Sequence, residues 1–286
     1  MIYDGKTEVY GVIGNPIAHT FSPQIQNTVA KIKNRNMVYV PFHVENDLES
    51  AIRGAYALQI KGLNITVPYK QDVIRYCCEV DSLAAQIGAV NTLVWTDKGY
   101  KGYNTDMPGL LRALKEEKLE LSKESVILLG AGGVARAIAL LCASQGVQEI
   151  YILNRTVENA EAIVREVKVM YPDCCMTPYS LTEYEKIPQK KYLTIQCTSV
   201  GLYPDDHKAV LMEDAFYNLV SCGYDLIYRP LETEFMRRVK RSGGKAYNGL
   251  HMLYYQAILA YELWTKKPVS GEDFHKVKEL LEAGIK

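Results

Sequence analysis

A glycine-rich turn separates an apolar run from the start of a helical pattern over residues 126–137. The run Val126–Leu129 predicts a buried strand, and Gly130-Ala131-Gly132-Gly133 predicts the turn that follows it. Gly130 permits a tight turn, Gly132 lets a pyrophosphate approach the backbone, and the small Ala135 lets the following helix pack close to the strand. The free N–H groups and the dipole of that helix would face the anion. The pattern therefore predicts a phosphate-binding turn.

A second polar group follows the next apolar run, Ile150–Leu153, in the form Asn154-Arg155-Thr156. Enzymes that use NAD carry an acidic residue at about this distance from the glycine turn, where it binds the ribose 2′-hydroxyl. No acid stands at these three positions, whereas the guanidinium of Arg155 and the hydroxyl of Thr156 suit a 2′-phosphate. A strand–turn–helix that binds nothing is the alternative. The paired signals favour a dinucleotide site and predict NADP as the cofactor.

Composition points to small-molecule chemistry. The 286 residues are 48% hydrophobic and 23% charged, which is typical of a globular protein of two domains. Lysine plus arginine number 33 and aspartate plus glutamate also number 33, so we expect neither nucleic acid nor a membrane as partner. The N-terminus has no signal pattern and no apolar stretch is long enough to span a bilayer, which predicts a cytoplasmic protein. The seven cysteines have no zinc spacing, so we expect reduced structural thiols and no metal.

Strand and helix patterns alternate along the chain, which predicts an α/β fold. In the first part we expect strands at 9–13, 37–43, 62–67, 89–95 and 99–103, and helices at about 23–33, 47–58, 81–86 and 106–118. In the second part we expect strands at 126–129, 150–153, 174–177, 193–197 and 221–226. Closing helices at 250–264 and 271–283 would return to the first domain. The predicted domains are therefore residues 1–104 with 248–286, and residues 105–247.

Four clusters outside the nucleotide-binding part carry more small polar side chains than a packed core tolerates without partners. Each lies at or just beyond the end of a predicted strand, where open α/β sheets bind their ligands. The clusters span residues 15–23, 64–70, 89–92 and 102–106.

Through these clusters and the glycine turn, the chain resembles the shikimate dehydrogenase family over essentially its whole length. G-N-P-I-A-H-T-x-S-P, N-x-T-V-P-Y-K, G-A-V-N-T, N-T-D, G-A-G-G, N-R-T, D-L-I-Y-R-P and G-L-x-M-L-x-x-Q-A occur in the family's order. The resemblance implies an N-terminal substrate-binding domain and a Rossmann-type NADP-binding domain, with the C-terminal helices returning to the first. It also implies the reversible reduction of 3-dehydroshikimate to shikimate by NADPH, on the chorismate route to aromatic amino acids.

The resemblance implies that Lys70 and Asp106 lie beside the reacting carbon. Chemistry supports this, because hydride addition to a ketone creates an alkoxide that needs a proton or a cationic donor, and an ammonium supplies both. Lys70 is the only lysine of the polar clusters, and Asp106 would orient it. Whether Lys70 transfers the proton or chiefly binds and polarises the substrate stays open at this point. The alternative interpretation is that Lys70 is a solvated surface lysine with no role in catalysis.

The resemblance also assigns the remaining contacts. Thr20 and Ser22, helped by Tyr228, would bind the substrate carboxylate, and Asn64, Asn91, Asp106 and Gln256 would bind its hydroxyls. For Thr66 a structural role and direct contact are equally compatible, and Ser22 with Pro23 also suits a helix N-cap and first turn. The cofactor would contact Gly130, Ala131, Gly132, Gly133, Ala135, Asn154, Arg155, Thr156, Thr198 and Gly249. His19 and the tyrosines of the closing segment are interpreted as structural.

The pattern departs from the family at Thr20, Gln196, Asn248 and His251, which puts substrate preference and hydride geometry in doubt. An NAD-preferring quinate/shikimate dehydrogenase, a dehydrogenase for an amino-substituted analogue and a catalytically silent ligand sensor remain alternatives. The polar run at 154–156 argues against the first, and the presence of both Lys70 and Asp106 argues against the last. We expect a monomer or a homodimer with a small-molecule substrate.

Overall fold

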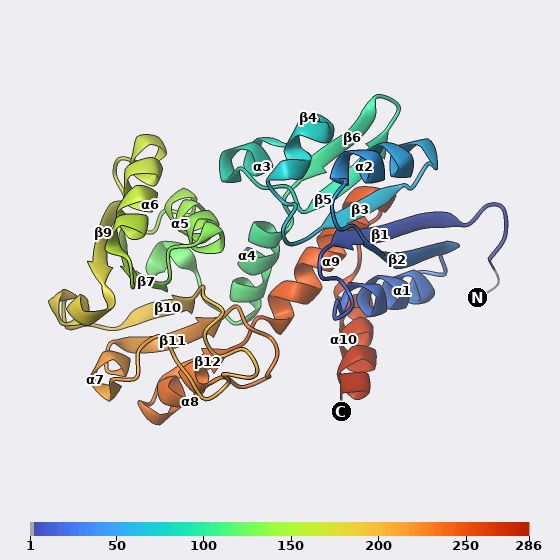
Figure 1. The fold of residues 1–286 in the computed structure, drawn as a ribbon. Coiled ribbons are helices and arrows are strands. Elements are labelled where there is room, and N and C mark those ends of the chain that lie inside the picture. Colours follow the sequence, from blue (N-terminus) through green and yellow to red (C-terminus); the bar gives the residue numbers. More distant parts are fainter. Residues whose placement is uncertain (1–2, 286) are drawn as a thin grey trace. The chain divides into compact units, whose positions relative to one another are not determined.

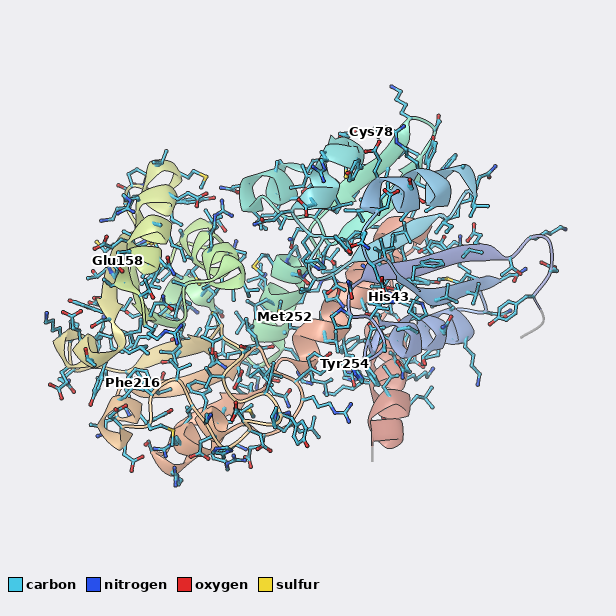
Figure 2. All side chains as sticks on the ribbon, in the orientation of Figure 1. His43, Cys78, Glu158, Phe216, Met252 and Tyr254 are labelled. Atoms are coloured by element: carbon cyan, nitrogen blue, oxygen red, sulfur yellow. The ribbon has the colours of Figure 1, made fainter. Side chains whose placement is uncertain are left out.

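The computed structural model describes residues 3–285 and divides the chain into two compact units (Figure 1). Unit 1 comprises Met1–Leu110 and Leu253–Lys286, and unit 2 comprises Leu111–Met252. Both changes of unit fall inside helices, namely α4 (Asp106–Glu116) and α9 (Leu250–Thr265). Met252, labelled in Figure 2, is the last residue of unit 2. The chain therefore passes between the units within helices and not through loops.

Unit 1 contains a mixed sheet of six strands in the order β2-β1-β3-β5-β6-β4. β5 runs antiparallel to both of its neighbours, β3 and β6, whereas the other neighbouring pairs are parallel. The strands are β1 (Glu8–Gly14), β2 (Met37–His43), β3 (Gly62–Ile65), β4 (Cys77–Val80), β5 (Thr92–Thr96) and β6 (Gly99–Tyr103).

Two helices of unit 1 begin where the side chain of an aspartate accepts a backbone N–H bond. Asp47 accepts from Ser50 N at the start of α2 (Leu48–Ala57), and Asp81 accepts from Leu83 N at the start of α3 (Ser82–Ile87). α1 (Ser22–Ile32) packs against β2 and against α10 (Gly271–Ile285), so the C-terminal helix belongs to this unit. A 3₁₀ turn, η1, spans Asp72–Tyr76. Within residues 3–285, no helix combines the length and apolarity needed to cross a membrane.

Unit 2 contains six parallel strands in the order β12-β11-β10-β7-β8-β9. The first strand of this unit, β7, is central. The chain adds β8 and β9 on one side of β7, and then β10, β11 and β12 on the other side. The strands are β7 (Val126–Leu129), β8 (Glu149–Asn154), β9 (Cys175–Ser180), β10 (Tyr192–Gln196), β11 (Val220–Asp225) and β12 (Lys245–Tyr247). The helices are α5 (Gly133–Ser144), α6 (Val157–Met170), α7 (Asp214–Tyr217) and α8 (Glu234–Arg241), with 3₁₀ turns η2 (Leu121–Lys123) and η3 (Leu181–Lys186).

The predicted fold class is confirmed, as two α/β units with the closing helix in the first. Two short strands, β4 and β12, were not predicted. Both are edge strands of three or four residues, too short for a period of two to be recognised. The strand expected from Ala89 begins at Thr92, and the one expected to reach Val67 ends at Ile65. The predicted change of domain at residue 105 compares with a division after Leu110 in the structure.

Each unit buries its own apolar core. In unit 2, Phe216 (Figure 2) is fully buried beside Tyr217 and Phe235. In unit 1, Trp264 of α9 packs against Tyr10 with ring centroids 5.1 Å apart, and its indole N–H donates to Leu93 O at 2.9 Å. Trp264 therefore anchors α9 on the sheet of unit 1.

This anchor predicts the effect of Gly62→Ala in β3. A Cβ at Gly62 would lie 2.2 Å from Trp264 Nε1, so the indole must move and its bond to Leu93 is lost. We expect a loss of about 1–3 kcal/mol in the free energy of unfolding, measured by urea titration. Gly54→Ala in α2 is the control, because a Cβ added at Gly54 would meet no atom within 4 Å, and a gain of about 0.4–1 kcal/mol is expected. Equal stabilities of the two variants would contradict this packing.

Candidate active site

The reversal of β5 brings three polar segments of unit 1 to one edge of the sheet. Asn64, near the end of β3, pairs with Thr92 at the start of β5, and Thr92 pairs with Tyr103 at the end of β6. A strand start therefore meets two strand ends. The cluster at 89–92 lies at the start of its strand and not after its end, and it reaches the site because β5 is antiparallel.

Asn91 lies at the centre of this edge and is 3% exposed. Its Oδ1 accepts three hydrogen bonds, from Thr105 N at 2.8 Å, from Thr92 Oγ1 at 3.0 Å and from Thr105 Oγ1 at 3.2 Å. These bonds fix which way the amide faces. The structure shows no acceptor for its NH₂ group in the described part of the chain, so a donor is available to a ligand.

Asn64 is held by a tyrosine that sequence reasoning missed. The hydroxyl of Tyr39 donates to Asn64 Oδ1 at 2.7 Å, and Asn64 Nδ2 donates to Thr92 Oγ1 at 3.0 Å. Burial raises the pKa of Tyr39 well above its usual value, and a hydrogen bond from Ser22 opposes this shift. Tyr39 thus connects Asn64 with Ser22, both of which are predicted to bind the substrate. Nothing in the sequence of β2 distinguishes it from a core tyrosine.

Lys70 and Asp106 meet as expected. Lys70 Nζ lies 2.7 Å from Asp106 Oδ2, and their side chains are 32% and 19% exposed. Val90 N donates to Lys70 O at 2.8 Å, which ties the lysine to the segment before β5, and Asn104 Oδ1 accepts from Asp106 N at 3.1 Å at the start of α4. Among residues 3–285, Asp106 is the only partner that the ammonium contacts, so two of its N–H bonds are free.

The other residues that were predicted to contact the substrate differ in their local hydrogen bonds. Ser22 is the first residue of α1 and its side chain does not cap the helix, so the N-cap interpretation is wrong; the cap position is Phe21. Thr20 Oγ1 accepts from Ser22 N at 3.3 Å, and Gln256 Nε2 donates to Leu253 O at 2.9 Å within α9. Thr66 follows β3 and its N–H donates to Ile13 O. Tyr228 belongs to unit 2, where burial raises the pKa of its hydroxyl.

The glycine turn of unit 2 has the form that its sequence predicts. Gly130 has φ +108°, in the region that favours glycine, and Gly132 is the N-cap of α5. No atom lies within 4 Å of a Cβ built at Gly132 or Gly133, so the start of α5 faces open space, whereas Ala135 is fully buried. Open space, unpaired helix N–H groups and the helix dipole suit a diphosphate.

The polar run after β8 is exposed. Asn154 Nδ2 donates to Thr156 O at 2.8 Å, which shapes the turn. Thr156 is the N-cap of α6 but its side chain makes no capping bond, and no carboxylate pairs with Arg155 among residues 3–285. The guanidinium and the hydroxyl are therefore both available. Glu158, labelled in Figure 2, lies in the first turn of the same helix.

Thr198 and Gly249 lie at the other half of the sheet. A Cβ built at Gly130 would lie 2.6 Å from Thr198 Cγ2, so the turns after β7 and β10 touch. Gly249 N donates to Ile227 O at 3.0 Å, beyond the end of β11. Of the departures, Asn248 Oδ1 accepts from Leu250 N, and His251 Nδ1 lies 3.0 Å from Glu117 Oε1.

A parallel sheet whose first strand is central, with a glycine turn at that strand's carboxyl end, is the Rossmann arrangement. With a lysine–carboxylate pair among amides and hydroxyls in a separate α/β unit, it defines a two-domain nucleotide-dependent oxidoreductase. Two family models match the chain: "Shikimate dehydrogenase substrate binding domain" over residues 12–93 and "Shikimate / quinate 5-dehydrogenase" over residues 113–200.

Individual relatives agree. The shikimate dehydrogenase (NADP(+)) of Caldanaerobacter subterraneus subsp. tengcongensis is 42% identical over 282 residues, covering 96% of each chain. Shikimate 5-dehydrogenase from Listeria monocytogenes, solved with shikimate and NAD, has a TM-score of 0.88 at 30% identity and covers 98% of each chain. The Thermus thermophilus enzyme, solved with NADP(H) and shikimate, has a TM-score of 0.82 at 30% identity and covers 94% of this chain and 98% of its own. The chain belongs to the shikimate dehydrogenase family.

The contact between the turns after β7 and β10 predicts the effect of Gly130→Ala. The new methyl would force a left-handed φ on alanine and would also press on Thr198 Cγ2. We expect a loss of about 2–4 kcal/mol in the free energy of unfolding, of which strain at φ contributes about 1–2 kcal/mol. Adding Thr198→Ser removes the contact but not the strain, so it should restore only part of the stability. Full recovery or none would contradict the two-part origin of the loss.

Proposed function

We propose that this protein catalyses the reversible, NADP-dependent reduction of 3-dehydroshikimate to shikimate, a step toward chorismate and the aromatic amino acids. The Lys70–Asp106 pair at 2.7 Å, beside the free amide donor of Asn91, carries the proposal. Membership of the family supports it, as do the relatives whose names include NADP. Unit 1 takes the substrate and unit 2 takes the nucleotide. We also propose that the functional domains are residues 1–104 with 248–286, which bind the substrate, and residues 105–247, which bind the nucleotide.

Within unit 1, neutral and charged donors would share the substrate. The NH₂ group of Asn91 and the free oxygen of Asp106 suit neighbouring ring hydroxyls, one donating and the other accepting. Asn64 and Gln256 would add further contacts with the hydroxyls. Thr20 and Ser22 would bind the carboxylate beside the start of α1, whose dipole stabilises an anion.

NADPH, when bound, supplies the hydride that adds to the ketone carbon. As charge develops on the ketone oxygen, the ammonium of Lys70 donates a hydrogen bond and then its proton, so the alcohol forms and Lys70 is left neutral until it takes a proton from water. Asp106 holds the ammonium in place through their 2.7 Å contact. In the reverse direction, neutral Lys70 accepts the hydroxyl proton.

Unit 2 fits NADP. The open space at Gly132 and Gly133 leaves room for the diphosphate, with Ala131 and buried Ala135 shaping the turn. Asn154, Arg155 and Thr156 would surround the adenosine ribose and its 2′-phosphate. Thr198 and Gly249 would lie at the nicotinamide end.

Two alternatives are answered by the same assay. A quinate/shikimate dehydrogenase that prefers NAD would reduce NAD with either substrate, and a ligand sensor would reduce neither nucleotide. The paired state of Lys70 and Asp106 favours an active enzyme over a sensor. Following absorbance of the reduced nicotinamide, with shikimate or quinate and with NADP or NAD, we expect activity with shikimate and NADP.

We further propose a cytoplasmic location and a monomer or homodimer that binds no nucleic acid or membrane. All seven cysteines lie in the described residues and are free thiols, as expected of a reducing compartment. The equal numbers of acidic and basic residues, 33 each, leave no field that would attract a polyanion.

Lys70→Ala tests the chemistry. Removing the proposed proton donor should lower kcat by about 10²- to 10⁴-fold. The dissociation constant for NADP should change less than about twofold, because the nucleotide binds unit 2. Lys101→Ala is the control, since it removes an ion pair with Glu79 on the same unit. A comparable loss of nucleotide affinity in Lys70→Ala would place this lysine elsewhere.

Arg155→Ala tests the cofactor. The loss of a charged donor to the 2′-phosphate should raise the KM for NADP by about tenfold or more and leave the KM for NAD almost unchanged. Arg165→Ala on α6, where Arg165 pairs with Glu161 in solvent, should change neither. If the KM rises equally for both nucleotides, Arg155 does not bind the 2′-phosphate.

A further inference from the structure

Unit 2 buries a carboxylate that the proposed reaction does not use. Asp225 ends β11 and is fully buried. Its Oδ2 accepts from Thr233 Oγ1 at 2.6 Å, and its Oδ1 accepts from Ile227 N at 3.0 Å and from Gln196 Nε2 at 3.3 Å. Asp225 forms no ion pair among residues 3–285. Three donors thus replace the water that an ionised carboxylate would otherwise need.

Gln196 extends this network to the next strand. It ends β10, is fully buried, and its Oε1 accepts from Thr198 N. Its Nε2 donates to Val200 O at 3.1 Å as well as to Asp225. One amide therefore fixes the turn after β10 and connects it to the carboxylate at the end of β11.

The turns held in this way belong to one half of the nucleotide site. In a doubly wound sheet each half of the strand order binds one mononucleotide of the dinucleotide, at the carboxyl ends of the strands. Arg155 follows β8, so the half made by β7, β8 and β9 takes the adenosine. The nicotinamide half then falls to β10, β11 and β12, where Thr198 touches the Gly130 turn and Gly249 bonds to Ile227.

Burial without a cation raises the pKa of Asp225 to about 6, although the bonds from Thr233 and Ile227 N oppose the rise. The titratable neighbour that faces it is the thiol of Cys197, whose own pKa is raised by burial. The charged residues of α8 are paired with other groups, because Glu234 binds both Arg237 and Arg238. Protonation of Asp225 would place a hydrogen on one carboxyl oxygen, where it would face one of the three donors. The hydrogen bond from that donor would then be lost.

We propose that Asp225 is a positioning residue for the nicotinamide half of the nucleotide, whose ionised carboxylate holds the turns after β10 and β11 in their binding form. The proposal rests on the proposed NADP-dependent function. The ionised form then binds the nucleotide more tightly than the neutral form, so affinity for NADP falls as Asp225 becomes protonated. The loss develops as pH falls through about 6 and levels off at about tenfold once Asp225 is neutral.

The stability of the fold should change in the opposite direction. The folded-state pKa of about 6 lies above the ordinary value of 3.8, so the folded protein holds this proton more tightly than the unfolded chain. The contribution of Asp225 to the free energy of unfolding is greatest below pH about 4 and is lost as pH rises to about 6. If Asp225 only stabilised the fold, nucleotide affinity would not increase between pH about 4 and about 6, where the free energy of unfolding decreases.

The test is calorimetric titration of the full-length protein with NADP between about pH 5 and pH 8, comparing wild type with Asp225→Asn. The amide imitates the neutral carboxyl, so we expect the dissociation constant of the variant to be about tenfold higher at pH 8 and to approach that of wild type near pH 5. The result is expressed as the ratio of the dissociation constant of the variant to that of wild type at each pH. The 2′-phosphate of NADP titrates with both proteins, so its effect cancels in this ratio. Thr194→Val is the control, because it removes a buried hydroxyl without a partner two residues before Gln196, and it should leave the ratio at one.

Thr233 supplies a second test if Asp225→Asn fails to fold. Thr233→Val removes the donor to Asp225 Oδ2, so the pH at which affinity is half lost should rise, and Thr233→Ser should return it toward wild type. A ratio that does not change with pH, or equal midpoints in both Thr233 variants, would overturn the positioning role. Wild type that binds no NADP at any pH would instead overturn the proposed function.

Discussion

The position of Asn91 beside the Lys70–Asp106 ion pair depends on one reversal of chain direction. The two residues are 36 positions apart, and Lys70 follows β3 whereas Asp106 begins α4 after β6. β5 lies between these strands and runs against both, so a strand start and two strand ends meet at one edge. An all-parallel order would place the residues before β5 at the far edge. The amide of Asn91 and the ammonium of Lys70 share an edge because of this reversal.

Both units place buried polar groups at strand ends and satisfy them internally. In unit 1, Tyr39, Asn64 and Thr92 form a hydrogen-bonded series behind the site. In unit 2, Thr233, Asp225 and Gln196 form another. Apolar side chains of equal size would give comparable or greater stability, since a buried polar group gains little beyond replacing its water. The value of each series lies in fixing neighbouring side chains and turns in one arrangement.

The nucleotide side combines a closed and an open part of the same turn. Gly130 is pressed against Thr198, whereas a Cβ added at Gly132 or Gly133 would meet no atom within 4 Å. The first contact sets the path of the chain from β7, and the open space leaves the helix N–H groups accessible. The chain also leaves each unit inside a helix, so α4 carries Asp106 in unit 1 and continues as part of unit 2.

Much was readable from the sequence, because the signals are local. Alternating patterns gave the α/β class, the glycine turn gave the phosphate-binding helix start, and the motifs gave Lys70 and Asp106 as a pair. Only the tertiary structure revealed Tyr39 behind Asn64, the unpaired donor of Asn91, Ser22 outside the cap position, and the burial of Asp225. Motifs and periodicity report residue types within a few positions, whereas hydrogen-bond partners and burial depend on strands paired across tens of residues. Desolvation of a carboxylate is therefore decided by the assembled sheet and not by its neighbours in the chain.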